Sequence, residues 1–323
     1  MNIELVDTEL AESLKLFPDL DIWTDLVKTR EMGAQMRAKM IGNLPPIEAV
    51  ESEDYWLQQA DGPEVWVRAY RPENQLEPLP ALLWIHGGGY CLGSMEADDH
   101  MVRQMVREVG MVVISVDYRL APEHPFPAAL NDATTALQWL ADNTDTLAID
   151  PARIAIGGIS AGAGLAAGLA LYVRDKTDIR LAFQFLLCPM IDDRCVTASS
   201  HMITDKRVWN RNSNLIAWQH YLHRDKTSEQ EPCIEVSEYA AASRATSLTG
   251  LPPAYIAVGS VDAFVDENRD YAQRLETTGV STQFKIFEGG FHGFEFMVPA
   301  TKLSKAARDS HYGALRSALF DLE

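Results

Sequence analysis

A lone serine stands between two glycines in the segment Ile154 to Gly164, which reads IAIGGISAGAG. Gly158 and Gly162 lie two positions before and after Ser160; an apolar run of strand type precedes the serine, and small residues at helical spacing follow it. In so sharp a strand-to-helix turn, flanking side chains would collide with the backbone, and the serine hydroxyl is lifted above the sheet edge. The helix N-terminus beneath it favours developing negative charge. This pattern predicts that Ser160 is a nucleophile.

A serine hydroxyl reacts well only when a neighbouring base takes its proton and a carboxylate orients that base. Asp262 follows the apolar run AYIAVGS, and His292 follows the next such run, QFKIFEGG. Taken singly, Asp262 fits a helix N-cap and His292 fits an ordinary loop histidine. Because both come after Ser160 and just beyond predicted strands, we expect all three at one edge of the sheet. The predicted catalytic residues are therefore Ser160, Asp262 and His292.

Three glycines follow His86 directly after another predicted strand, in the run LLWIHGGGY. Amides in a loop without side chains can approach a substrate oxygen closely and stabilise the negative charge that develops on it. We expect Gly88, Gly89 and Ala161 to donate these hydrogen bonds. A phosphate-binding loop is the alternative, but no Lys-Ser or Lys-Thr follows the glycines.

Other patterns match ligand sites only in part. Residues 162–164 open a helix as in a dinucleotide site, but Gln184 stands near the position where such a site needs an acidic residue. His220 and His223 with Cys195 or Cys233 match no common zinc spacing, so we interpret the histidines as part of a helical face. Three aromatic residues at helical intervals are interpreted as packing within the helical cap described below, with an acyl pocket as the alternative: Trp209, Trp218 and Tyr221.

The chain around these motifs alternates between strands and helices. Six apolar runs lack polar alternation and predict parallel strands covered on both faces, and Glu64 to Tyr70 predicts the second arm of a hairpin that begins near Tyr55. Repeated strand and helix units imply an α/β fold with an open, mostly parallel sheet and helices on both faces. The strands are expected at 81–89, 111–118, 153–158, 180–188, 254–260 and 283–290, and the helices at 98–108, 128–143, 161–175, 266–278 and 301–322.

Two regions fall outside this alternation. Residues 1–50 contain two helical segments, and residues 190–250 form a connection too long for a simple loop, with a helix expected at 205–223. We expect these two regions to form one helical cap over the carboxyl edge of the sheet, where open α/β sheets bind ligands. Residues 51–189 and 251–323 are then the two parts of the core.

The composition of the 323 residues, 47% of them apolar, suits one large globular core. The formal net charge of -18 repels phosphate backbones and argues against a nucleic-acid partner. Ala161 to Val173 is the longest run of small apolar residues and is shorter than the roughly 20 residues that span a bilayer. The acidic start MNIELVDTELAES lacks the basic region of an export signal, and the four cysteines are unevenly spaced. We expect a cytoplasmic protein with reduced thiols and no membrane span.

The motifs together resemble those of the hormone-sensitive-lipase-like branch of the α/β-hydrolases. The resemblance runs from about residue 80 to residue 295 and implies the α/β-hydrolase fold with a helical cap. It also implies carboxylic ester hydrolysis without metal or organic cofactor, a small-molecule ester as substrate and, in many members, a homodimer. His86 is then a residue that shapes the oxyanion loop and is not the general base. The motifs are His86-Gly87-Gly88-Gly89, DYRLAPEHPFPAAL at 117–130, the Ser160 turn, Asp262 with Asp266, and His292-Gly293-Phe294.

Two positions depart from the family pattern. Ile159 stands before the serine where the family usually has Asp, and Ala263 with Phe264 replaces the usual Pro-Leu after the acid. Neither change removes a catalytic group, but Asp266 becomes an alternative acid. Asp262 is favoured because it lies closest to the strand end.

The sequence therefore predicts a serine carboxylesterase that acts on small, short-acyl esters through an acyl-enzyme intermediate. The short acyl chain is implied by the resemblance, and the acidic protein is expected to prefer neutral esters. Amide or lactone hydrolysis would use the same residues, and a receptor that binds a small ligand under the cap is a further alternative. A histidine base predicts that activity falls as the pH drops through about 6.5.

Overall fold

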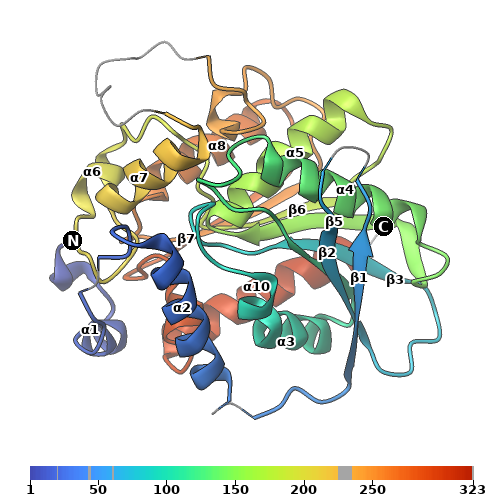
Figure 1. The fold of residues 1–323 in the computed structure, drawn as a ribbon, viewed down its shortest axis with the longest axis horizontal. Helices are drawn as coiled ribbons and strands as arrows, with labels where there is room; N and C mark the ends of the chain where they lie inside the picture. Colours follow the sequence, from blue (N-terminus) through green and yellow to red (C-terminus); the bar gives the residue numbers. More distant parts are fainter. Residues whose placement is uncertain (20, 43–44, 60–61, 225–234, 322–323) are drawn as a thin grey trace.

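The computed structural model describes residues 1–19, 21–42, 45–59, 62–224 and 235–321 (Figure 1). An eight-stranded sheet with the order β1-β2-β4-β3-β5-β6-β7-β8 runs through the molecule. Its strands are β1 (Val50–Leu57), β2 (Val65–Pro72), β3 (Leu79–Ile85), β4 (Val112–Asp117), β5 (Ile149–Ile159), β6 (Phe183–Leu187), β7 (Ala254–Gly259) and β8 (Thr282–Phe287).

Most of the sheet is parallel. The pairs β1–β2 and β2–β4 are antiparallel, and all neighbouring strands from β4 to β8 pair in parallel. Every residue of β6 and β7 is buried, as expected for strands covered on both faces. The six apolar runs and the hairpin predicted from the sequence are thus confirmed as strands.

Helices cover both faces of the sheet. One face packs against α4 (Ala128–Asp142), α5 (Ala161–Lys176) and α8 (Val265–Thr277), and the other packs against α3 (Asp99–Val109) and α10 (Lys302–Phe320). In Figure 1 the first group lies above the sheet and the second group below it. The five predicted core helices are confirmed within one or two residues at each end. Short helices are η1 (Ile3–Leu5), η2 (Met95–Asp98), η3 (Ala242–Arg244) and α9 (Phe294–Met297).

The two regions outside the alternation carry further helices. Residues 1–50 contain α1 (Thr8–Leu14) and α2 (Leu26–Ile41), and residues 190–250 contain α6 (Ala198–Met202) and α7 (Arg211–Tyr221). The two regions touch, because the indole N–H of Trp23 donates to Ser213 Oγ at 3.0 Å.

The helix expected at 205–223 begins later than the sequence predicted. The helix is α7, and it begins at Arg211 because the side chain of Asn210 caps it by accepting from the amide of Ser213. Within the described ranges, no helix has both the length and the apolar character needed to cross a bilayer.

Candidate active site

Ser160 occupies the turn between β5 and α5. Its backbone has φ 57° and ψ -121°, an unfavourable conformation for a residue with a Cβ. A Cβ at Gly162 would lie 2.6 Å from the carbonyl carbon of Ile85, and one at Gly158 would lie 2.6 Å from the carbonyl carbon of Gly162. The turn therefore excludes larger residues at both flanking positions, which is the physical reason for the glycine pattern in the sequence.

The three predicted catalytic side chains meet at the carboxyl edge of the sheet. Ser160 Oγ lies 2.9 Å from His292 Nε2, and His292 Nδ1 lies 2.8 Å from Asp262 Oδ2. Ser160 follows β5, while Asp262 and His292 lie in the loops after β7 and β8. Because a carboxylate accepts, Nδ1–H of the neutral imidazole donates to Asp262 and leaves Nε2 as acceptor for the serine hydroxyl. The arrangement can move a proton from serine to histidine.

The environment of His292 raises its pKa. Its burial acts to lower the pKa, but the adjacent Asp262 carboxylate outweighs burial and holds the pKa of His292 well above the usual value of 6.5. The side chain of Asp262 is fully buried, so little solvent screens the interaction. The loss of activity at low pH is therefore expected to set in above the value of about 6.5 that an ordinary histidine predicts.

Asp266 lies close in sequence but is held elsewhere. Its carboxylate accepts from the amide of Ser199 at 2.8 Å and pairs with Arg269 at 3.0 Å. The Ser199 hydroxyl also donates to the carbonyl of Ala263 at 2.9 Å, which ties the acid loop to the start of α6. The structure thus brings Asp262, and not Asp266, to the histidine.

The two departures from the family pattern have local support. Ile159 packs against an apolar cluster formed by Cys188 and Val258 at the ends of β6 and β7 and by Val265 at the start of α8. At the acid loop, the amide of Phe264 donates to Asp262 Oδ1 at 3.0 Å. Asp262 is therefore fixed by hydrogen bonds to both of its oxygens.

The glycine loop after β3 lies beside the serine. A Cβ at Gly87 would lie 3.4 Å from Ser160 Cβ, so no side chain separates the two. Among the described residues, no backbone carbonyl outside helices and strands accepts from the amides of Gly88, Gly89 or Ala161. Such a backbone acceptor would compete with the oxyanion role that the sequence predicts for these three amides.

His86 stabilises the glycine loop through its ring and its backbone carbonyl. Its buried ring stacks on Tyr118 with a centroid distance of 4.2 Å, and Nδ1–H donates to the carbonyl of Gly87 at 2.8 Å. The Tyr118 hydroxyl donates to the carbonyl of His86 at 3.0 Å. These contacts fix the loop and leave proton transfer to His292.

Trp209 contacts the glycine loop, which its helical spacing in the sequence did not predict. Its ring lies against the oxyanion loop, since a Cβ at Gly89 would lie 2.8 Å from Trp209 Cζ2. The ring centroid is 6.3 Å from that of His292 and 6.0 Å from that of Trp23, which comes from the N-terminal region. Trp209 therefore packs with Trp23 of the other predicted cap region and also reaches the glycine loop, which agrees with the alternative of an acyl pocket. Trp218 and Tyr221 are buried and pack against each other, with ring centroids 5.9 Å apart, and both also contact Tyr90 after the glycine loop.

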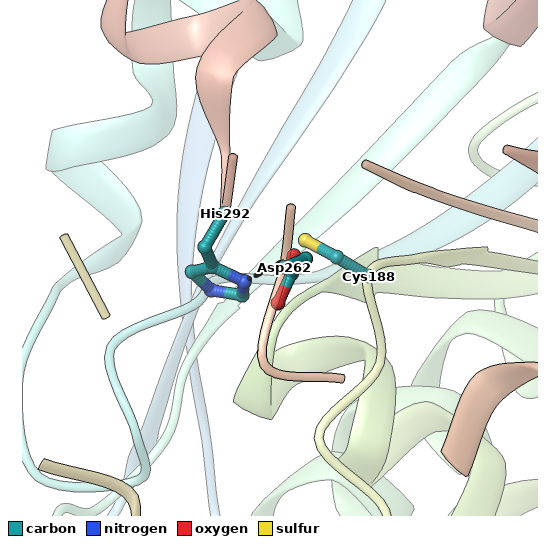
Figure 2. Close-up of side chains that lie close together, drawn as sticks. All are labelled: Cys188, Asp262 and His292. Atoms are coloured by element: carbon teal, nitrogen blue, oxygen red, sulfur yellow. Dashed lines mark hydrogen bonds and ion pairs between the residues drawn. The ribbon is translucent and has the colours of Figure 1, made fainter. Parts of the chain in front are cut away.

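Cys188 lies at the site although the sequence did not single it out. It follows β6, and Figure 2 shows its side chain beside Asp262 and His292. Its Sγ, a carboxylate oxygen of Asp262 and a ring nitrogen of His292 all lie within 4.8 Å of one another. Burial raises the pKa of the Cys188 thiol. The only sequence signal was its position at the end of a predicted strand.

The histidines and cysteines that match no common zinc spacing in the sequence make other contacts where the structure describes them. The ring of His220 lies 6.1 Å from that of Trp23. Cys233 falls outside the described residues, and the thiol of Cys195 is 3.1 Å from Asn214 Nδ2, which donates to it.

Comparison with known proteins places the chain in a family. A family model described as the alpha/beta hydrolase fold matches residues 82–296, about two thirds of the chain. The chain belongs to the α/β-hydrolases. Curated relatives of this α/β-hydrolase include carboxylesterase NlhH of Mycobacterium tuberculosis, 33% identical and covering 73% of this chain and 74% of the relative. Carboxylic ester hydrolase LipN of the same species is 32% identical over 91% of this chain and 77% of its own.

Solved structures extend the similarity to the whole α/β-hydrolase chain. A structure titled bacterial heroin esterase superposes with a TM-score of 0.93 at 39% identity and covers 99% of both chains. Esterase LipW from Mycobacterium marinum superposes with a TM-score of 0.87 at 34% identity, covering 99% of this chain and 98% of its own. These matches confirm the fold and the family resemblance expected from the motifs.

Proposed function

We propose that this α/β-hydrolase is a serine carboxylesterase that hydrolyses small, short-acyl carboxylic esters through an acyl-enzyme intermediate. The observation that carries the proposal is the unbroken hydrogen-bond chain from Ser160 to His292 to Asp262, with distances of 2.9 and 2.8 Å. Relatives named as carboxylesterases and a structural neighbour titled as an esterase support the same chemistry.

In the acylation step, Ser160 Oγ attacks the ester carbonyl while its proton passes to His292 Nε2. The negative charge of Asp262 stabilises the imidazolium that forms, as the raised pKa of His292 indicates. The alcohol then leaves with the proton from Nε2, and the acyl group stays on Oγ. Each charge that develops on the histidine is thus balanced by a buried carboxylate at hydrogen-bond distance.

The amides of Gly88, Gly89 and Ala161 are the proposed donors to the oxyanion of each tetrahedral intermediate. In the deacylation step, His292 takes a proton from water, the hydroxide attacks the acyl carbonyl, and Ser160 recovers its proton as the acid departs. One preorganised donor in such a hole is typically worth about a hundred- to a thousandfold in rate.

The aromatic residues at the site support a short acyl chain. Trp209 lies on the oxyanion loop, and Trp23 packs beside it from the other region, with ring centroids 6.0 Å apart. We propose on this basis that residues 1–50 and 190–250 form the cap, with 51–189 and 251–323 as the core. Large rings beside the nucleophile leave less room for long chains.

The net charge of -18 supports a preference for neutral over anionic esters. A homodimer and a cytoplasmic location remain predictions from the sequence. Amide and lactone hydrolysis would use the same residues, and the proposal favours esters because the relatives are named for them.

The test is a rate profile over p-nitrophenyl esters of increasing acyl length for the wild-type protein and Ser160→Ala. We expect the highest kcat/KM at acetate or butyrate and a loss of at least about 10⁴-fold in the variant. A fluorophosphonate should label the wild-type protein at Ser160, which a receptor without a reactive serine would not allow. Undiminished turnover by Ser160→Ala would reject the proposal, and faster turnover of long-chain emulsions would reject the short-acyl preference.

A further inference from the structure

We propose that Cys188, Asp262 and His292 form a binding site for one soft divalent cation, Zn²⁺ or Cd²⁺, which reversibly switches the hydrolase off. The cation site rests on the three donors alone, and only its inhibitory effect rests on the proposed function. It differs from the zinc pattern in the sequence, which involved His220 and His223.

The donor atoms are of the kinds that zinc prefers. A thiol sulfur, a ring nitrogen and a carboxylate oxygen lie within 4.8 Å of one another (Figure 2). In a tetrahedral site, with bonds of about 2.3 Å to sulfur and about 2.0 Å to nitrogen and oxygen, neighbouring donors lie about 3.3 to 3.5 Å apart. Binding therefore requires the 2.8 Å contact between Asp262 and His292 to open by about 0.5 Å. The sulfur lies no more than 4.8 Å from the other two donor atoms, so it needs to approach them by at most about 1.3 Å. A water molecule can complete the tetrahedron.

The strand ends already hold the donors in place. Cys188 is the first residue after β6, and its amide donates to the carbonyl of Ala257 in β7 at 2.6 Å. Asp262 follows β7 and His292 follows β8, so the donors come from three adjacent parallel strands. Cys188 and Asp262 are 3% and 1% exposed, so few water molecules compete for these donors.

The charges at this buried position also balance. A divalent cation bound by one thiolate, one carboxylate and a neutral imidazole gives a site with no net charge, which removes the main penalty for burying an ion. On binding, the Cys188 thiol releases its proton to solvent. The imidazole keeps one proton, which moves from Nδ1 to Nε2 when the cation takes the place of the Nδ1 proton.

This shift of the imidazole proton explains the inhibition. His292 Nε2 must accept from Ser160 for the serine to attack. With a cation on Nδ1, Nε2 carries a proton and cannot accept another at neutral pH. The bound ion therefore removes the base without covering the serine, and a chelator that withdraws the ion restores activity.

The binding test needs no ester hydrolysis. Metal-free Ser160→Ala protein is titrated with Cd²⁺ while the ultraviolet charge-transfer absorbance of thiolate-bound Cd²⁺ is recorded. We expect saturation at one equivalent per chain, loss of this signal in Ser160→Ala/Cys188→Ala, and retention in Ser160→Ala/Cys91→Ala. Cys91 is the matched control because its thiol is also buried but belongs to no cluster of three metal-ligating side chains among the described residues.

The inhibition test compares wild-type protein, Cys188→Ala and Cys188→Ser, each relative to its own metal-free rate. We expect Zn²⁺ to inhibit the wild-type protein, EDTA to restore it, and the half-inhibiting concentration to rise at least tenfold in either variant. Equal Cd²⁺ absorbance with and without Cys188, or equal zinc sensitivity in all three proteins, would overturn the proposal. If the wild-type protein lacks esterase activity, the absorbance titration still decides whether the site exists.

Discussion

The choice between Asp262 and Asp266 as the acid is the sharpest test of the proposed site. The substitutions Asp262→Asn and Asp266→Asn make the same chemical change four positions apart, in the loop after β7 and in the first turn of α8. The side chain of Asp262 is fully buried and bonded to His292, whereas that of Asp266 is 32% exposed and bonded to Ser199 and Arg269. The pair therefore separates the orienting role from general effects on the loop.

The magnitude follows from hydrogen-bond donors and acceptors. In Asp262→Asn, the amide nitrogen would donate to His292 Nδ1, so the imidazole proton would move to Nε2 and face Ser160. The base would then be held in the wrong tautomer, which in a triad of this kind costs about 10⁴-fold in kcat, or about 5 kcal/mol. In Asp266→Asn, the amide oxygen can still accept from the amide of Ser199, so we expect a loss of less than about tenfold.

The pH profile gives an independent readout. Because His292 must be neutral to act as base, activity is lost as the pH falls through its pKa. Asp262 holds that pKa well above 6.5, so the acid limb of kcat/KM in wild-type protein should lie above this value. In Asp262→Asn the lowering effect of burial remains without the opposing charge, and the limb of the residual activity should move to lower pH.

The assay is hydrolysis of p-nitrophenyl acetate from pH 4 to 9 in buffer with a chelator, with far-ultraviolet circular dichroism to confirm folding. Equal losses in the two variants would refute the assignment of Asp262. So would an acid limb in Asp262→Asn that stays at the wild-type position.

Two further substitutions test other parts of the site. Trp209→Ala should raise the ratio of octanoate to acetate hydrolysis about tenfold, because it opens space beside the oxyanion loop. Trp56 is an exposed tryptophan of β1, so Trp56→Ala should leave this ratio unchanged in the same rate profile. Gly162→Ala should lower the free energy of unfolding by at least about 2 kcal/mol in urea titrations and abolish turnover, because its Cβ would overlap the backbone at Ile85; an active, equally stable variant would contradict the tight turn.

The sequence predicted the sheet and the core helices well because their signals are local. Apolar runs such as those of β6 and β7 are buried on both faces, and the pattern of burial alone identifies them. Gly158 and Gly162 also predicted a local feature, the tight turn at Ser160, because the close approach of the backbone at both positions leaves no room for a side chain. The order of the strands then brings their ends together, so Ser160, Asp262 and His292 could be named before any contact was known.

The contacts of Trp209 and Cys188 with the site could not be predicted in this way, because they join segments that are distant in the sequence. Trp209 lies just before the α7 cap Asn210, and nothing local shows that its ring reaches Gly89, more than a hundred positions earlier. Cys188 has the signature of any small buried residue after a strand, and only the pairing of β6 beside β7 sets it next to Asp262. Local pattern therefore identifies the reacting groups, whereas the side chains that limit the substrate or admit a metal ion depend on the tertiary structure around them.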